Sequence, residues 1–376
     1  MRNLWNLLLR LIWTGAVVTL CASGLESQQF LFTNDNISKA NSTTALTVQN
    51  GGALEVLKTY STGGKGAGGQ VFFGVNEIAS AVTAAQTCLF VSNGGDSTIA
   101  AFTVDPSSGK LQAVSGSPFS YGVTGAQEGG IGLAAGNGEL LFAGNTGSES
   151  ISVLKISPSC SLTAGNTYKL SGSPDGMKVT PNGNYLIISY FGGSVDSFKI
   201  GYSGGKLTEM GPFSSQGATA GVDISCNSQF AYFGDLASNT EVEVFSLSKG
   251  ILTELQNFTN SNGVSSANIL LGATGSRLYV SNTLSNQITT LTVGMNGKVT
   301  YGSTVNLNSP GLYALGMTMG ANDPHLFVSE QGNPEMIGVL STRKKTVREV
   351  GGSPFDVIKN GEDPASVAAV PTFTCP

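Results

Sequence analysis

The chain has 376 residues, of which 40% are hydrophobic and 11% charged, with 51 glycines and a formal net charge of −5 at pH 7. Enough apolar surface is present to form a large core, which excludes a disordered chain. Nucleic acid and other polyanions are disfavoured as partners, because nucleic-acid recognition needs a field of clustered Lys and Arg, and the chain has five Arg in all. Abundant Gly, Ser, Thr and Asn, with few helix-forming residues, predict an all-β fold.

The first 27 residues have the pattern of an export signal. Arg2 and Arg10 flank the first apolar residues, an apolar segment follows at 11–22, and small residues precede Gln28. This segment is short for a membrane-spanning helix. We therefore expect a signal peptide at 1–27, with an uncleaved N-terminal anchor as the alternative. Residues 28–376 are then expected to be secreted, periplasmic or at the cell surface, with no transmembrane domain beyond the N-terminal segment.

One strand motif recurs seven times after residue 28. It reads LFTND, LFVSN, LFAGN, LIISY, AYFGD, LYVSN and LFVSE, and it begins at residues 31, 89, 141, 186, 231, 278 and 326. Successive copies are 45 to 58 residues apart, a period typical of β-propeller blades. Each copy follows one strand and precedes a hairpin of two more strands, as at 175–190 and 193–210. Each repeat is therefore predicted to be a blade of four antiparallel strands.

The two ends of the chain supply incomplete repeats that complement each other. Residues 363–370 resemble an innermost strand with no second strand after it, while 30–35 is a second strand with no innermost strand before it. Pairing them would complete one blade and remove an exposed sheet edge. We therefore predict a seven-bladed β-propeller over 28–376, closed by its N- and C-terminal strands.

Four cysteines follow the export segment: Cys88, Cys160, Cys226 and Cys375. An exported chain meets oxidising conditions, where these residues could pair in any of three connectivities. None has the CxxC spacing of a metal site, so structural disulfides are favoured.

Polar residues recur where the motif strands end, on the face that we call the top. The candidate ligand-binding residues there are Asn34, Asn93, Asn145, Asp235 and Asn282. Acidic residues are expected at the start of innermost strands, namely Glu77, Glu128, Asp175, Asp223 and Asp363. Such an oxygen-rich ring could hold Ca²⁺ or bind the hydroxyls of a sugar-like ligand. The alternative is that these side chains cap strand ends and turn amides.

Catalysis by a Ser-His-Asp triad is excluded, because the only histidine, His325, is predicted in a turn on the opposite, bottom face. Every Arg after residue 28 is also predicted at the bottom. Carboxyl pairs could still perform acid-base chemistry, either Glu128 with Asp175 or Glu330 with Glu77. A metal-activated water at the acidic top is a further scheme. The candidate catalytic residues are thus Glu128, Asp175 and Glu330.

The units at 89–111 and 180–200, together with GSPF at 116–119 and 352–355, resemble the lactonase-like seven-bladed propeller family. That family includes 6-phosphogluconolactonase-type propellers and is similar to the fungal carboxymuconate cyclase. The resemblance implies hydrolysis of a sugar-derived lactone. Family blades carry Arg after the motif Asn, whereas this chain has Gly94, Thr146 and Thr283, which argues against a phosphorylated substrate.

Two hypotheses follow from these observations. The first is an exported lactonase that uses top-face carboxyls, with Ca²⁺ as a candidate cofactor. The second is a non-catalytic propeller whose top face binds a protein, a glycan or a cell-envelope component. The resemblance favours the first, and the absence of the family's top-face Arg and His favours the second.

Overall fold

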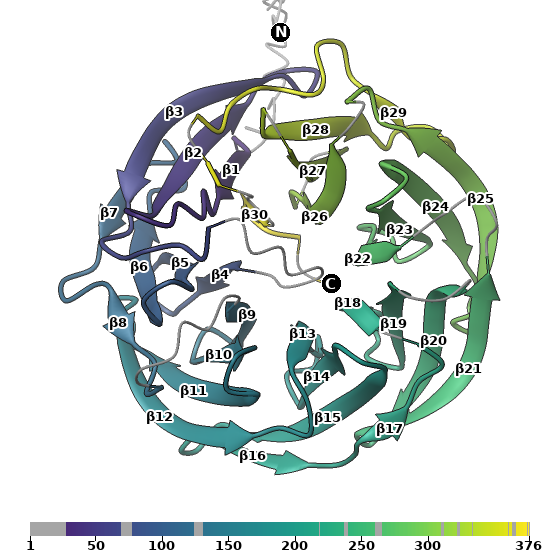
Figure 1. Ribbon diagram of the computed structural model, residues 1–376, viewed down its shortest axis with the longest axis horizontal. Helices are drawn as coiled ribbons and strands as arrows, with labels where there is room; N and C mark the ends of the chain where they lie inside the picture. The colour runs from purple at the N-terminus through teal and green to yellow at the C-terminus, as the bar shows by residue number, and fades with distance from the viewer. Residues whose placement is uncertain are drawn as a thin grey trace, which may run out of the picture.

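The computed structural model describes residues 28–68, 77–123, 131–217, 219–236, 240–259, 265–309, 312–321, 324–332, 334–359, 361–362, 366–373 and 375. The expected export segment, 1–27, lies outside these residues. All regular elements in the described part are strands, and they form seven sheets arranged as a ring (Figure 1). No helix there has the length and apolar character needed to cross a membrane. The predicted all-β, seven-bladed propeller is confirmed.

Within each blade the strands follow one another from the central channel outward. Blade 1 contains β30 (Val367–Val370), β1 (Phe30–Thr33), β2 (Ser42–Val48) and β3 (Leu54–Ser61). Blade 2 contains β4 (Ile78–Val82), β5 (Thr87–Asn93), β6 (Thr98–Val104), β7 (Leu111–Ala113) and β8 (Phe119–Ser120). Blade 3 contains β9 (Ile131–Gly136), β10 (Leu140–Asn145), β11 (Ser150–Ile156) and β12 (Leu162–Lys169).

The remaining blades repeat this order. Blade 4 contains β13 (Pro174–Val179), β14 (Tyr185–Tyr190), β15 (Ser194–Gly201), β16 (Lys206–Glu209) and β17 (Phe213–Ser214). Blade 5 contains β18 (Thr219–Ile224), β19 (Phe230–Asp235), β20 (Thr240–Ser248) and β21 (Ile251–Thr259). Blade 6 contains β22 (Ser266–Leu271), β23 (Arg277–Asn282), β24 (Gln287–Val293) and β25 (Val299–Asn306). Blade 7 contains β26 (Tyr313–Met319), β27 (His325–Gln331), β28 (Met336–Ser341) and β29 (Arg348–Glu349).

The recurring motif builds the core because successive side chains of a strand point to opposite faces of its sheet. Leu31 packs in a cluster with Phe327 of blade 7, while the next residue, Phe32, packs in a cluster with Leu89 of blade 2. All four side chains are fully buried. One motif therefore seals its blade against both neighbours, and seven copies fill the ring.

A Pro-Phe pair interrupts an outermost strand and restarts it in two blades, within GSPF at 116–119 and within GPF at 211–213. Pro118 separates β7 from β8, and Pro212 separates β16 from β17, because proline has no N–H to donate to a sheet. The following phenylalanine then rejoins the third strand, as Phe119 does opposite Ile99 and Phe213 opposite Val195. This interruption explains why two of the sheets have five strands instead of four.

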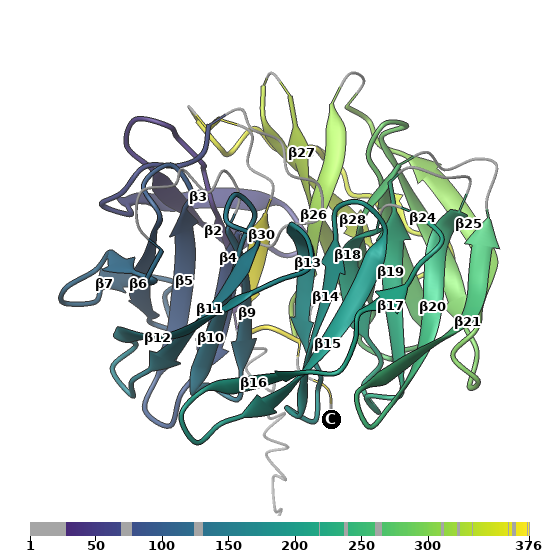
Figure 2. The same cartoon turned by 60° about the horizontal axis from the view of Figure 1, so that its bottom comes forward.

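The ring is closed as the sequence predicted. β1 pairs antiparallel with β30, from Phe30 opposite Val370 to Thr33 opposite Val367. The tail beyond β30 then runs beneath the centre of the ring, where the C-terminus lies in both views (Figure 1 and Figure 2). Thr372 forms a bridge to Gly320 of blade 7, and its hydroxyl is 2.6 Å from that of Ser80 in blade 2.

The structure contains two disulfides, which correspond to one of the three possible pairings of the four cysteines. Cys88 of β5 pairs with Cys160, which lies in the β11–β12 turn, so blades 2 and 3 are joined covalently. Cys226 of the β18–β19 turn pairs with Cys375. The second bond ties the tail to blade 5, on the far side of the ring from blade 1.

Candidate functional site

The inner wall of the ring is irregular at its top. In blades 4 to 7 the innermost strand shifts register against the second strand near its start, between Pro174 and Met177 in β13 and between Ala314 and Met317 in β26. Such bulges re-aim side chains and are common beside active sites. The repeated bulge marks the upper channel wall as the candidate site.

Small residues and serine hydroxyls fix this wall. A Cβ added to Gly176 would lie 2.5 Å from the carbonyl oxygen of Ala220 in the next blade, so only glycine allows the blades to approach this closely. The amide of Gly176 donates to Ser189 Oγ at 2.8 Å, and Ser189 donates in turn to Ala220 O. Ser281 accepts from the Asn268 amide in the same way in blade 6. These contacts hold the innermost strands of blades 4 and 5 close together.

Asp175 is the second residue of β13, near the top of an innermost strand, where the sequence predicted it. It lies inside the bulge of blade 4. Its side chain is 4% exposed, and Oδ2 has no hydrogen-bond partner among the described residues. Burial raises the pKa of Asp175 well above its usual range. Glu77, directly before β4, is 2% exposed, and burial raises its pKa to about 8. Burial thus holds Glu77 largely protonated in neutral solution and favours the protonated form of Asp175 in the same way.

Glu330, near the end of β27, is fully buried within blade 7. Ser309 donates a hydrogen bond to its Oε2, and a Cβ on Gly338 would overlap its Oε1. Burial, reinforced by the charge of Glu349, raises the pKa of Glu330 to about 8. Neither a hydrogen bond nor a mutual electrostatic effect joins Glu330 to Glu77 in the structure. The other expected pair cannot be placed, because Glu128 lies outside the described residues.

Asp223 corrects one expectation. It was predicted at the start of an innermost strand, but it is the fifth of six residues in β18. There it accepts from the amide of Leu271 at 2.8 Å and forms an ion pair with Lys178 at 3.2 Å. The inner strand begins earlier in the sequence than predicted. β18 starts at Thr219, which pairs with Asp235 at the top, so Asp223 lies four residues further along the strand.

The candidate ligand-binding residues form a buried belt between the second and third strands. Asn34, Asn93, Asn145, Asp235 and Asn282 are each at most 1% exposed. Asn145 Nδ2 donates to the hydroxyls of Ser150 and Ser152, at 3.0 and 3.2 Å. Direct contact of these residues with a ligand stays a prediction. The amide group of Asn145, for example, already donates its hydrogen bonds to hydroxyls of the protein.

The belt also links neighbouring blades. Asn282 Nδ2 donates to Glu241 of blade 5 at 3.1 Å and to Thr289 of its own blade at 2.8 Å, while its Oδ1 accepts from Ser266. Asn41, which precedes β2, donates to Asn34 of its own blade and to Asn93 across the boundary to blade 2.

Three buried acids on third strands, Asp196, Glu241 and Glu243, escaped the sequence analysis. Asp196 accepts from the Tyr190 hydroxyl at 3.2 Å, and burial raises its pKa to about 7. Glu243 accepts from the amides of Gln216 and Gly217, and burial raises its pKa to about 7. The detectable signal was an acid between apolar residues of one strand, as in EVEV at 241–244. Among the described residues, no group of three or more His, Cys, Asp or Glu could hold a metal ion.

The bottom face holds the His and Arg residues, as predicted. His325 begins β27 and is 6% exposed, with its ring against Gly52 of blade 1. Arg277 begins β23 and donates to the carbonyls of Thr342 and Lys344 in the β28–β29 turn. Arg343 and Arg348 belong to that turn and to the start of β29.

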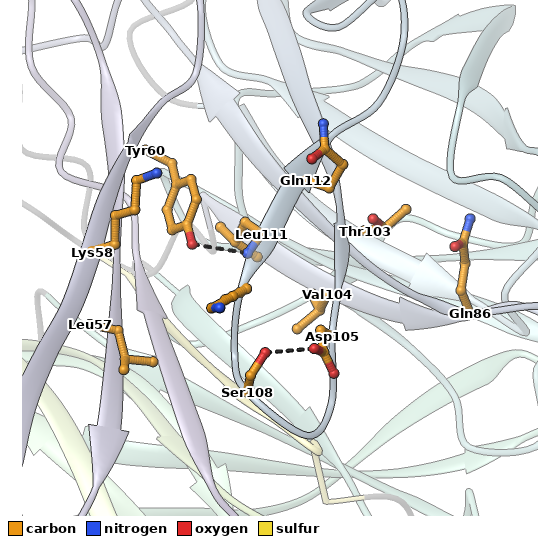
Figure 3. Close-up of a pocket in the computed structure, with 11 residues that line it drawn as sticks. Leu57, Lys58, Tyr60, Gln86, Thr103, Val104, Asp105, Ser108, Leu111 and Gln112 are labelled. Atoms are coloured by element: carbon orange, nitrogen blue, oxygen red, sulfur yellow. Dashed lines mark hydrogen bonds between the residues drawn. The ribbon is translucent and has the colours of Figure 1, made fainter.

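A hollow of about 630 Å³ lies on the outer rim, away from the channel mouth (Figure 3). It separates β3 of blade 1 from the β6–β7 hairpin of blade 2. Tyr60 accepts a hydrogen bond from the Leu111 amide across it, and Lys58 Nζ lies 4.8 Å from the Tyr60 ring centre. None of the predicted site residues lines this hollow.

Comparison with known proteins identifies the architecture. No family model matches the chain, and no curated protein matches it either. Among solved structures, a proposed 6-phosphogluconolactonase from Bacteroides fragilis has a TM-score of 0.74 at 18% identity, covering 92% of this chain and 99% of its own. One from Bacteroides uniformis has a TM-score of 0.70 at 17% identity, covering 91% and 99%. A periplasmic gluconolactonase from Pseudomonas aeruginosa has a TM-score of 0.69 at 17% identity, covering 93% and 99%. The chain therefore has the fold of the lactonase-like seven-bladed β-propellers.

Proposed function

We propose that this protein hydrolyses a neutral, sugar-derived lactone at the top of its central channel. The observation that carries the proposal is the set of buried carboxyls, Glu77, Asp175 and Glu330, in which burial raises the pKa and favours the protonated form. Opening a lactone requires a proton for the departing ring oxygen, and a carboxyl with a raised pKa can donate it. The fold shared with proteins named as lactonases supports this reading.

In the proposed reaction, water attacks the lactone carbonyl carbon and the bond to the ring oxygen then breaks. We assign proton donation to Asp175, because it alone among the three lies in a bulge of an innermost strand. Glu128, expected at the start of the neighbouring innermost strand, is the candidate base that takes the proton from water. Glu330 is the third candidate, in the second strand of blade 7. The proposed steps need no metal. Whether Ca²⁺ raises the turnover is tested by adding it to the assay.

The substrate is proposed to be unphosphorylated. Arg is the residue best suited to clamp a phosphate with paired hydrogen bonds. Every Arg after residue 28 lies on the bottom of blades 6 and 7, which leaves only lysines near the top. A phosphorylated lactone would therefore gain little from this face.

A pH-stat assay of residues 28–376 tests the proposal, with neutral sugar lactones and one phosphorylated lactone, with and without Ca²⁺. We expect turnover of a neutral lactone that is lost on Asp175→Asn or Glu128→Gln and kept on Glu139→Gln, an exposed control on the bottom. Turnover that survives both substitutions would refute the assigned roles. No turnover of any lactone by folded protein would refute the function.

The alternative, a non-catalytic binding propeller, is favoured by a different observation. Three large apolar side chains are exposed at the top: Phe191 at 64%, Leu284 at 60% and Tyr313 at 44%. They lie in the β14–β15 turn, in the β23–β24 turn and at the start of β26. Exposed apolar residues of this size often mark a protein or glycan contact. If no lactone is turned over, capture of a partner that is lost on Phe191→Ser and Leu284→Ser would support this reading.

We also propose that the protein is exported. The pattern of residues 1–27 and the two disulfides support an oxidising compartment. The similar structure from Pseudomonas aeruginosa is named as periplasmic. Detection of oxidised residues 28–376 outside the cytoplasm would support export, and fully reduced cysteines in cytoplasmic protein would refute it.

A further inference from the structure

Charge is divided unequally between the two faces of the ring. The seven turns that join third to outermost strands lie at the bottom, at 49–53, 105–110, 157–161, 202–205, 249–250, 294–298 and 342–347. They contain six cations (Lys110, Lys249, Lys298, Arg343, Lys344 and Lys345) and one carboxylate, Asp105. The seven turns joining second to third strands, at the top, contain one cation, Lys39, and four carboxylates. A chain with a net charge of −5 therefore has basic turns between its third and outermost strands.

The six cations, which we call the cationic turns, are available for an external partner. All six residues are exposed. Within the described part of the chain, only Lys169 with Glu149 and Lys178 with Asp223 form ion pairs. Asp105 is the one carboxylate in these turns and offsets one positive charge, while its oxygens accept from the hydroxyls of Ser107 and Ser108. The turns therefore keep an excess of five positive charges, which no ion pair among the described residues takes up.

The densest part of this charge is held on a fixed backbone. Arg343, Lys344 and Lys345 are consecutive, and Arg348 follows at the start of β29. Arg277 Nη1 donates to the carbonyls of Thr342 and Lys344, at 2.8 and 2.9 Å. Thr342 Oγ1 also donates to the Pro324 carbonyl at 2.7 Å. The turn is anchored through its main chain, so its cationic side chains stay free to contact a surface.

The upstream chain enters the propeller on this same face. Gln28 Nε2 donates to the Val48 carbonyl at 2.8 Å, and Val48 is the last residue of β2 before the bottom turn at 49–53. In that turn, Gly52 lies against His325 of blade 7, since a Cβ there would be 2.9 Å from the imidazole ring. The apolar sequence at 11–22 therefore leads to a point beside the blade 7 turn.

We propose that the cationic turns dock the bottom of the propeller on an anionic phospholipid surface. Such a surface complements the lysines and arginines of these turns. In the alternative in which 1–27 remains as an uncleaved anchor, the apolar segment joins the propeller on this same face, which favours lipid over a soluble polyanion. Docking in this orientation leaves the top mouth of the channel directed away from the membrane, where ligands can reach it.

Vesicle co-sedimentation of residues 28–376 tests the proposal. Every strand and both disulfides lie within these residues, so this chain keeps the whole ring. The probes are phosphatidylcholine vesicles with and without phosphatidylglycerol, at low and high salt. The variant Arg343→Glu, Lys344→Glu, Lys345→Glu is compared with a top-face control, Lys39→Glu, Lys65→Glu, Lys359→Glu. The control residues are also exposed and give the same change in net charge.

We expect binding to anionic vesicles only, falling with salt, and reduced at least about 100-fold in the blade 7 variant, since each basic residue contributes about fivefold near an anionic surface. The control variant should keep most of the binding. Equal losses in the two variants would show that only net charge matters and would overturn the proposal. Binding to soluble heparin without binding to anionic vesicles would overturn it in favour of a polyanion.

Discussion

The buried carboxyl of Glu330 makes a quantitative prediction about stability. Its pKa is raised from 4.5 to about 8 in the folded protein, whereas the unfolded chain exposes it to water. Between these two pH values the folded state holds a proton that the unfolded state has released. The free energy of unfolding must then fall as pH rises, by about 1.4 kcal/mol per pH unit for one such group. From pH 5 to pH 8 the loss amounts to about 4 kcal/mol.

Glu330→Gln removes this penalty while keeping the shape of the side chain. The amide can still accept from Ser309, so packing within blade 7 is largely kept. We expect wild type and variant to converge in stability near pH 5, and the variant to become the more stable by a few kcal/mol as pH approaches 8. The difference is an upper value, because relaxation around a buried charge reduces it.

Guanidinium chloride unfolding at several pH values between these limits measures the effect. Glu139→Gln, an exposed residue of the β9–β10 turn, controls for the loss of a surface carboxylate. Stability curves of wild type and Glu330→Gln that stay parallel across the range would refute the argument, since the carboxyl would then titrate alike in both states. Lactonase activity measured on the same variant separates a structural role from a catalytic one.

Three further predictions concern the scaffold. Replacing Cys226 and Cys375 by Ser should lower the free energy of unfolding by about 2–5 kcal/mol, because the bond spans 149 residues; denaturation under non-reducing conditions checks this, and an unchanged midpoint would contradict it. Gly176→Ala should cost about 1–3 kcal/mol through its clash with Ala220 O, whereas Gly351→Ala, with open space around it, should not. Asn282→Ala should cost about 2–3 kcal/mol, since it leaves buried Glu241 without this donor; a shift in thermal midpoint no larger than that of a surface substitution would refute the role of the belt.

The fold was predictable because one physical rule repeats. One residue of a motif strand packs against the preceding blade, and the next residue packs against the following blade. Two consecutive apolar residues, such as Leu31 and Phe32, therefore indicate a sheet on each side of the strand. Seven copies at blade spacing then fix the number of blades, and the unmatched strand at each end fixes the closure. The pairing of Cys88 with Cys160 was not predictable, since it depends on how a turn of one blade meets a strand of the next.

The site was less predictable, because it depends on register shifts that no sequence pattern marks. The position of Asn145 at the end of its strand was read correctly, but its burial follows from the hydroxyls of Ser150 and Ser152 on the adjacent strand. Likewise, the bulge in β13 decides that Asp175 faces into the protein. For Asp223, a difference of four residues in the start of a strand moved a predicted top-face acid toward the bottom.

The closure by β30 has a consequence for biosynthesis. The strand that completes blade 1 is residues 367–370, so β1, which is made first, has no inner partner until almost the whole chain has been synthesised. During that time β1 is an open edge of a hydrophobic sheet, and such edges pair readily with other chains. Only then does the tail reach blade 5, where an oxidant of the oxidising compartment can convert the thiols of Cys375 and Cys226 to their disulfide. A nascent chain stalled short of β30 is therefore expected to depend on chaperones, because no partial ring can shield its own first strand.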